Sequence, residues 1–212
     1  MTRLILLRHG QSEANERKIF SGQWDFPLTE LGVLQAELAA KYLVKNEKID
    51  VIYSSDLQRA YNTALPVSRA LGLPIIKDRE LREFDLGRWT KLTREQVQQE
   101  YFESWNQEFS VRHYPGGEYA PDAFERSVRA ITRIAEANPD KCVLIAAHAG
   151  VIRSFDAFTK GYSKKELSKV PDCHNAAISI YEFNEGISTV IRTDIIDHLD
   201  GDHGMLSGRN FI

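Results

Sequence analysis

Short continuous apolar runs recur along this chain and are separated by longer amphipathic stretches. Strands that are covered on both faces have runs of this kind, because neither face meets water. Four such runs predict strands at residues 4–7, 51–53, 73–76 and 142–147. Two more strands are predicted at 176–183 and 188–195, with a turn between them at 184–186.

Apolar residues at helical spacing predict two helices between these runs. The first follows Thr29, a favourable N-cap, and its apolar face consists of Leu31, Leu34, Leu38 and Tyr42. The second begins at Ser55 or Asp56 and carries Ala60, Ala64, Val67 and Leu71. Pro66 is expected to bend or interrupt this second helix.

Three further helix starts are indicated by capping-box spacing or a close relative of it. They lie at Thr93 with Gln96, Asp122 with Glu125, and Ser163 with Glu166. Strands that alternate with helices predict an α/β layered fold around a largely parallel sheet. Because ligands bind beyond the carboxyl ends of such strands, the RHG tripeptide at 8–10 is expected at the ligand edge.

Length, charge and hydropathy narrow the class of protein. A chain of 212 residues fits one domain with a substantial core. The net charge is -3 and the basic residues are scattered rather than arranged in a stripe, which argues against binding to nucleic acid. No apolar run approaches the ~20 residues that span a bilayer, and the start of the chain does not read as a secretory signal. We therefore expect no membrane contact and a cytoplasmic location.

The sequence predicts no metal site. Cys142 and Cys173 form no CxxC pair and indicate neither a disulfide framework nor bound zinc. From about residue 195 the chain is polar and irregular, and this tail holds Asp197, His198, Asp200, Asp202 and His203. Their spacing fits neither an EF-hand loop nor an HExxH helix, so we expect a tail that folds near the pocket rather than a metal centre.

Charged side chains follow the predicted strands at four places. They are Arg8 with His9 after the first strand, Arg59 early in the second helix, Glu83 in LREFDLG, and His148 after the strand at 142–147. If the fold brings these places together, the arginines and a helix N-terminus form a pocket for a tetrahedral oxyanion. This predicts a phosphate pocket, although a carboxylate pocket would use the same groups.

The same residues can carry out phosphoryl transfer. A neutral His9 can attack phosphorus through one ring nitrogen while a hydrogen bond, usually to a backbone carbonyl, holds the other, and Gly10 allows the close approach that this needs. Glu83 is the candidate acid that protonates the leaving alkoxide and then, as a base, activates water. The two arginines and a protonated His148 would supply positive charge at the transition state without a metal ion or other cofactor.

Five stretches of the chain follow one another as they do in a known family. In order, RHGQSEAN, SSDLQRAYNTA, LREFDLGRW, PGGE and AHAGVIR resemble the histidine phosphatase superfamily, also called the phosphoglycerate mutase-like family, up to about Asp194. The resemblance implies a three-layer α/β/α sandwich with a mostly parallel central sheet. It also implies a single domain over residues 1–212, with an inserted helical lobe at about 90–125.

The resemblance further implies roles for single residues. It makes His9 the phosphorylated nucleophile and Glu83 the proton donor, and it assigns phosphate binding to Arg8, Arg59 and His148. The matching asparagine, which commonly contacts the phosphoryl group, is Asn15.

The chain departs from the family pattern at several positions that line the pocket. The common SHGG is AHAG here, which puts Ala147 and Ala149 at two of these positions. The family's GxWEG reads GRWTK at 87–91, and the glutamine that often precedes the loop glycine, Gly22, is Ser21 here. We still expect Ser21, Gly22 and Ala149 to bind substrate.

Four aromatic residues are candidates for a wall around the organic part of a substrate. They are Phe84, Trp89, Trp105 and Tyr114. Core packing is the competing interpretation, because large aromatic side chains are usually buried among other apolar groups.

The sequence thus predicts a metal-independent phosphatase that hydrolyses a small phosphomonoester metabolite through a phosphohistidine at His9. Sugar phosphates, phosphoserine and the nucleotide-loop phosphate of cobalamin synthesis are open as substrates. The chain gives no sign of a dimer surface, and a homodimer is an open alternative to a monomer.

Two alternatives remain at this point. A phosphoglycerate mutase would use the same pocket, but the 64 residues between Glu83 and His148 are short beside the insert of the mutases. Cations that could still hold a substrate carboxylate are Arg82, Arg88, Lys91, Arg94 and Arg112. A non-catalytic regulator that binds phosphorylated metabolites is the second alternative, and it is disfavoured because both nucleophile and acid are present.

Overall fold

The computed structural model of the protein describes residues 1–199, apart from the side chain of Ser168. Its strands are β1 (Thr2–Arg8), β2 (Val51–Ser54), β3 (Ile75–Lys77), β4 (Cys142–Ala147), β5 (Ile178–Asn184) and β6 (Ile187–Ile195). Its α-helices are α1 (Glu13–Glu16), α2 (Glu30–Asn46), α3 (Gln58–Leu71), α4 (Arg94–Glu100), α5 (Phe102–Trp105), α6 (Ala120–Glu136) and α7 (Ala149–Thr159). Short 3₁₀ helices cover Arg79–Leu81, Gly87–Trp89, Phe109–Val111, Lys164–Lys169 and Asp197–Leu199.

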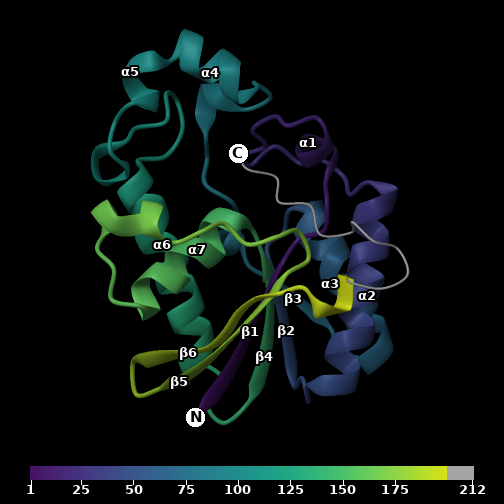
Figure 1. Ribbon diagram of the computed structural model, residues 1–212. Helices are drawn as coiled ribbons and strands as arrows, with labels where there is room; N and C mark the ends of the chain where they lie inside the picture. The colour runs from purple at the N-terminus through teal and green to yellow at the C-terminus, as the bar shows by residue number, and fades with distance from the viewer. Residues whose placement is uncertain (200–212) are drawn as a thin grey trace.

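The strands form one six-stranded sheet in the order β3-β2-β4-β1-β5-β6 (Figure 1). The first four strands of this order are parallel, β5 is antiparallel to β1, and β6 is antiparallel to β5. All six predicted strands are present, and the mostly parallel sheet is confirmed. The carboxyl ends of β1, β2 and β4 therefore meet at one edge of the sheet, where we expect ligands to bind.

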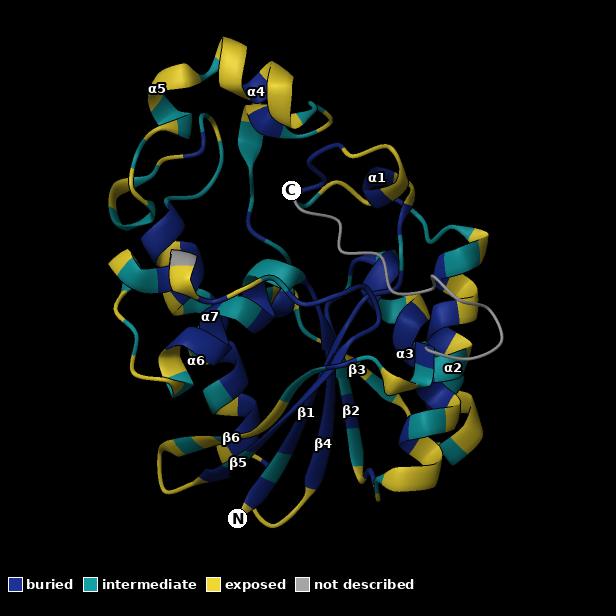
Figure 2. Cartoon of the chain, in the orientation of Figure 1, coloured by how far each residue is buried: buried dark blue, intermediate teal, exposed yellow. Residues whose placement is uncertain are grey.

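Helices cover both faces of this sheet (Figures 1 and 2). On one face, alternate residues of β1 pack against α6 and α7, in a cluster that includes Leu4, Leu6, Ile131 and Phe155. On the other face, the intervening residues pack against α2 and α3, in a cluster that includes Ile5, Leu7, Ala39 and Val67. Burial on both faces explains the continuous apolar run of β1. The three-layer α/β/α sandwich is confirmed.

The buried face of α2 differs from the predicted one. The four residues expected to be buried are only partly so, and Leu34 is 40% exposed. The helix instead buries Ala36, Ala39 and Ala40, together with Gly32, Gln35 and the single leucine Leu43. Alanines on this face leave room for the large side chains of the sheet at close-packed density. Hydrophobicity alone favoured the leucines, because the sequence does not give the spacing between helix and sheet.

Two predicted helix starts, at Thr29 and Thr93, are confirmed, whereas α3 begins at Gln58 with Leu57 as its N-cap and not at Ser55 or Asp56. Thr29 caps α2 by accepting a hydrogen bond from the N–H of Gly32, and Thr93 forms a capping box at the start of α4. Ser163 also forms a capping box, but the segment that follows is a 3₁₀ helix. Residues 13–16, for which the apolar pattern predicts no element, form the single turn α1 with Ser12 as its cap.

Two further differences from the expected helices involve prolines. Pro66 does not interrupt α3, which continues to Leu71. The helix expected from Asp122 begins earlier, with Tyr119 as its N-cap and Pro121 in its first turn. Proline suits that turn, because the N–H that it lacks would have no partner within the helix.

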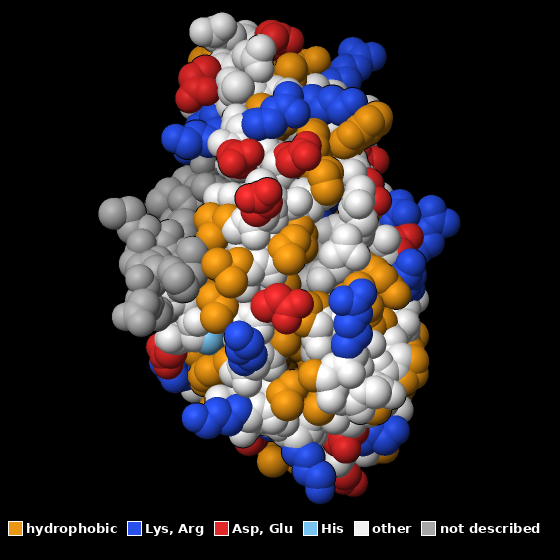
Figure 3. Space-filling model, turned by 90° about the vertical axis from the view of Figure 1, so that its right-hand side faces the viewer, with side chains coloured by type: hydrophobic (Ala, Val, Ile, Leu, Met, Phe, Trp, Pro, Cys, Tyr) orange, Lys and Arg blue, Asp and Glu red, His pale blue; other side chains and the backbone are white. Residues whose placement is uncertain are grey.

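The surface of the described part is mixed in character. Helices α4 and α5 stand away from the sheet and are largely exposed (Figure 2). On the face that Figure 3 displays, Lys and Arg side chains are interspersed with Asp and Glu. Within residues 1–199, no helix combines the length and hydropathy that crossing a bilayer requires.

Two glycines let the loop after β1 lie directly against the start of α2. A Cβ atom on Gly10 would lie 2.4 Å from the carbonyl oxygen of Gly32. A Cβ atom on Gly32 would lie 2.0 Å from the carbonyl oxygen of Gln11. The opposing atoms belong to the main chain and cannot rotate away. The loop that carries His9 is therefore fixed by α2.

We expect Gly10→Ala to lower the free energy of unfolding by about 3 kcal/mol, the upper end of the usual cost of overpacking. Urea unfolding followed by circular dichroism measures this loss. Gly161→Ala is the comparison, because no described atom lies within 4 Å of an added Cβ there and its φ of 72° leaves only the cost of alanine in left-handed backbone, about 1 to 2 kcal/mol. An unfolding curve of Gly10→Ala that matches the wild type would contradict the close approach.

Candidate active site

The register between β1 and β4 brings two histidines together. Arg8 is paired with Ala147, the last residue of β4, so His9 and His148 leave neighbouring strands at the same level. The centroids of their imidazole rings are 5.2 Å apart. The main-chain N–H of His9 donates to the carbonyl oxygen of Ala147 at 3.0 Å, which ties the two loops together.

His9 has the protonation that a nucleophile needs. Its Nδ1 lies 2.7 Å from the carbonyl oxygen of Gly10. A carbonyl oxygen only accepts hydrogen bonds, so Nδ1 carries the proton and the lone pair is on Nε2. Burial and the charges of Arg59 and Arg8 hold the pKa of His9 well below its ordinary value, so the ring is neutral at pH 7. The backbone carbonyl expected from the sequence is present.

Two buried arginines lie beside His9. Arg8, the last residue of β1, donates from Nη1 to the carbonyl oxygen of Cys173. Arg59, in the first turn of α3, donates to the carbonyl oxygens of Gly22 at 2.7 Å and Trp24 at 2.8 Å. Burial lowers the pKa of Arg59 to about 10, which leaves it charged at pH 7. Within the described residues, the buried Nε of each arginine has no acceptor, which suits a bound anion.

His148 differs from the expectation in its charge. We expected a protonated imidazole, but burial and the charges of Arg59 and Arg8 hold the pKa of His148 well below its ordinary value. The ring is therefore neutral at pH 7, with Nε2 2.9 Å from Oγ of Ser55. The sequence separates these groups widely, so it does not reveal that two fixed cations surround the histidine.

Glu83 lines the same cavity as His9 and is held by main-chain groups. Its carboxylate accepts hydrogen bonds from the N–H of Phe84 at 2.9 Å and of Gly150 at 3.2 Å. A Cβ atom on Gly150 would lie 2.4 Å from Oε1 of Glu83, so only glycine leaves room for the carboxylate. Burial raises the pKa of Glu83 above its ordinary value, although these two hydrogen bonds and Arg59 oppose the rise. A proton donor near neutral pH needs a shift in this direction.

A cavity of about 200 Å³ opens between these groups. Seven residues singled out from the sequence line it: Arg8, His9, Asn15, Ser21, Gly22, Glu83 and Ala149. Arg59 and His148 are fully buried and do not line the cavity. Oδ1 of Asn15 accepts hydrogen bonds from Ser12 and Asn175, so its NH₂ group is the end that could donate to an anion. The fold thus brings all nine residues to one end of the sheet.

Aromatic side chains form a wall of this cavity. All four aromatic candidates, Phe84, Trp89, Trp105 and Tyr114, are among its lining residues. The ring centroid of Trp89 lies 5.0 Å from that of Tyr114 and 5.7 Å from that of Trp105. Phe20 and Phe109 also line the cavity and were missed, because neither belongs to a recognisable motif. The wall offers apolar surface for the organic part of a ligand.

Two further cations line the cavity. Of the five considered as carboxylate contacts, only Arg112 lines the cavity. Arg153 of α7 also lines it and was missed, and its Nη1 lies 3.3 Å from Asp172. Lys91 instead lies over the ring of Trp24, and Arg94 lies over that of Trp105.

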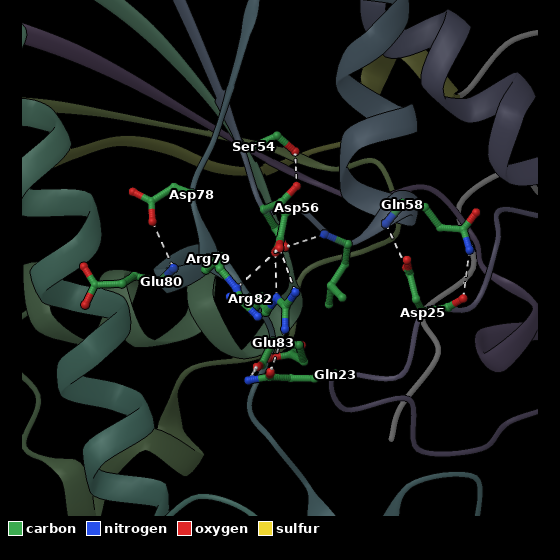
Figure 4. A network of polar contacts seen from close by, with 12 residues as sticks. Gln23, Asp25, Ser54, Asp56, Gln58, Asp78, Arg79, Glu80, Arg82 and Glu83 are labelled. Carbon is green, nitrogen blue, oxygen red and sulfur yellow. Dashed lines mark hydrogen bonds and ion pairs between the residues drawn. The ribbon is translucent and has the colours of Figure 1, made fainter.

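A polar network holds the segment that carries Glu83 (Figure 4). Arg82 forms a bidentate ion pair with Asp56, at 2.6 and 2.7 Å, and so joins the loop before α3 to the segment that carries Glu83. Nε2 of Gln23 donates to the carbonyl oxygen of Glu83 at 3.1 Å. Asp56 is thus paired with Arg82, and Arg59 is fully buried rather than part of a surface ion pair.

The acidic and histidine residues of the tail are only partly visible. Asp197 pairs with Arg192 at 2.7 Å, and Nε2 of His198 donates to the carbonyl oxygen of Ala176 at 3.0 Å. The remaining three, Asp200, Asp202 and His203, lie outside the described residues. Up to residue 199, no group of three or more His, Cys, Asp and Glu side chains is arranged to hold a metal ion.

Comparison with known proteins gives this arrangement a family. The sequence profile of the histidine phosphatase superfamily (branch 1) matches residues 4–195. The chain belongs to this superfamily. Phosphoserine phosphatase 1 of Hydrogenobacter thermophilus is 32% identical over 204 residues, which cover 94% of this chain and 95% of that protein.

Solved structures of other histidine phosphatases have the same fold. A mycobacterial glucosyl-3-phosphoglycerate phosphatase superimposes with a TM-score of 0.82 at 31% identity, covering 91% of this chain and 98% of that one. The alpha-ribazole phosphatase from Shigella flexneri gives 0.80 at 27% identity, with 91% and 96% covered. The family resemblance inferred from the five motifs is confirmed, and these relatives are phosphatases.

Proposed function

We propose that this protein is a metal-independent phosphatase that hydrolyses a small phosphomonoester through a phosphohistidine at His9. The observation that carries the proposal is the neutral His9 in the cavity, with its lone pair on Nε2, beside two buried arginines and in the same cavity as a carboxyl group of raised pKa. Membership of the histidine phosphatase superfamily and the phosphatases among its relatives support it.

The reaction has two steps in this proposal. Nε2 of His9 attacks phosphorus, the bond to the ester oxygen breaks, and Glu83 gives its proton to the departing alkoxide. Glu83, now ionised, then takes a proton from water, which attacks the phosphohistidine and releases inorganic phosphate and neutral His9. Arg8 and Arg59 balance the charge on the phosphoryl oxygens in both steps. A phosphoryl group beside His148 would also favour the charged form of that imidazole.

The lining of the cavity supports a small anionic substrate. The aromatic wall would pack against the organic part of the substrate. Arg112 and Arg153, which also line the cavity, would attract a second negative charge on the substrate. The names of the relatives include phosphoserine and glucosyl-3-phosphoglycerate, and both compounds combine a phosphate ester with a carboxylate. A phosphoglycerate mutase remains the alternative, because Arg112 and Arg153 would suit its substrate as well.

We expect selective release of inorganic phosphate from some members of a panel of phosphorylated metabolites, at the same rate with and without a metal chelator. Colorimetric phosphate assays measure it. Loss of activity with the chelator, restored by a divalent cation, would contradict metal independence. If no ester released phosphate, isomerisation of phosphoglycerate in the presence of a bisphosphorylated primer would test the mutase.

A further inference from the structure

The candidate acid lies in a segment with no regular secondary structure. Residues 83–86 connect two short 3₁₀ helices and belong to neither. General acid catalysis requires the carboxyl group within hydrogen-bond reach of the leaving oxygen, so a loop in this position needs an external support. The hydrogen bonds to Phe84 and Gly150 fix the carboxylate, but they do not fix the main chain that carries it.

Arg126 of α6 contacts three main-chain carbonyl oxygens between Glu80 and Glu83. Its Nη1 donates to the carbonyl oxygens of Glu80 at 2.7 Å and Arg82 at 2.9 Å. Its Nη2 lies 3.3 Å from the carbonyl oxygen of Glu83 itself. One planar guanidinium thus holds the segment up to the acid, which a lysine ammonium could not do with the same geometry.

Glu118 fixes the orientation of Arg126. The two side chains form a bidentate pair at 2.8 and 2.9 Å, and they are only 25% and 15% exposed. Oε2 of Glu118 also accepts a hydrogen bond from the N–H of Asp85 at 2.8 Å. The pair therefore contacts the main chain on both sides of Glu83. Gln23, and the ion pair of Arg82 with Asp56, provide further contacts to the same segment (Figure 4).

We propose that Arg126, oriented by Glu118, is a positioning residue for the general acid Glu83. This inference rests on the proposed phosphatase function. Arg126 does not touch the substrate in this proposal. It acts by keeping the Glu83 carboxyl group within hydrogen-bond reach of the leaving oxygen. Replacing Arg126 should therefore slow the same esters as replacing Glu83, but by a smaller factor.

The same helix offers matched controls. Arg129 and Arg133 also form ion pairs with this region, but through the side chains of Glu80 and Asp78. They are 61% and 51% exposed, and no hydrogen bond joins either of them to the main chain of Glu83 among the described residues. Replacing one of them removes a positive charge from α6 without releasing the acid.

The experiment compares esters whose leaving groups differ in their need for a proton. Arg126→Gln, Arg126→Lys, Glu118→Gln and Arg129→Gln are assayed with p-nitrophenyl phosphate and with an alkyl phosphate that the wild type hydrolyses. We expect Arg126→Gln and Arg126→Lys to lower kcat for the alkyl ester by about 10- to 100-fold, which is the cost of misplacing a catalytic group by up to about 1 Å. The rate with p-nitrophenyl phosphate should change much less, because nitrophenolate leaves without protonation. Arg129→Gln should match the wild type with both esters.

Several results would overturn the inference. An equal loss with both esters would indicate general damage to the fold, and wild-type rates in Arg126→Lys would indicate that only the charge matters. Adding Arg126→Gln to Glu83→Gln should slow the alkyl ester no further, and an additive loss would count against positioning. If Arg126→Gln does not fold, Arg126→Lys and Glu118→Gln decide the question. A wild type that releases no phosphate even from p-nitrophenyl phosphate would instead refute the proposed function.

Discussion

Replacing His9 by alanine is expected to lower phosphate release by at least about four orders of magnitude, the scale of losing the nucleophile in covalent catalysis. The fold should persist, because the hydrogen bonds of His9 to Ala147 and Ala176 use only main-chain atoms. Phosphate release measures the first expectation, and thermal unfolding measures the second. When the reaction with a substrate labelled in its phosphoryl group is stopped rapidly without acid, the wild type should carry the label on the protein and the variant should not.

A matched variant shows whether the loss of activity is specific to His9 or follows from replacing any histidine. His113 is exposed and stacks on Tyr119, with ring centroids 4.3 Å apart, outside the lining of the cavity. His113→Ala should keep wild-type turnover. Full activity in His9→Ala would refute the phosphohistidine mechanism itself.

Replacing Glu83 by glutamine should slow the hydrolysis of alkyl esters by about 10² to 10⁴, the range of general acid catalysis. Glutamine has nearly the same shape but no carboxyl proton to give. The effect should be smallest for p-nitrophenyl phosphate, whose leaving group needs no proton. Asp172→Asn is the control, since it removes another carboxylate from the same cavity and should affect all esters alike.

The pH dependence of the wild type should report the same group. Because burial raises the pKa of Glu83, its acid form persists to higher pH than that of an ordinary glutamate and is lost as pH rises through the raised value. The rate of the step that needs the acid should therefore fall on the alkaline side. Glu83→Gln should remove this decline, and an unchanged pH profile in the variant would assign the decline to another group.

Much of the architecture was predictable because its physical signal is local. The apolar run at 4–7 is continuous since both faces of β1 are buried, and the same holds for Cys142–Ala147. Motif order then predicted that Arg8, His9, Glu83 and their partners would meet, since strand ends converge at one edge of a parallel sheet.

The features that were not predictable depend on distances between segments far apart in the chain. The sequence favoured leucines for the buried face of α2, but the depth of the layer selected alanines. The neutral state of His148 in the free site was not predictable, because its charge depends on arginines that only the fold places nearby. Arg126 carried no signal at all, since an arginine in a helix beside acidic residues usually forms a surface pair.

The antiparallel edge of the sheet also has a practical use in the laboratory. Since Phe183 of β5 is paired with Thr2 of β1, the turn after β5 lies at the end of the sheet remote from His9. Glu185 and Gly186 in this turn have positive φ angles and are exposed, as is Met1 nearby in the same layer. An affinity tag, a fluorophore or a surface tether attached there would leave the catalytic edge accessible. The protein can therefore be immobilised in one orientation for single-turnover measurements.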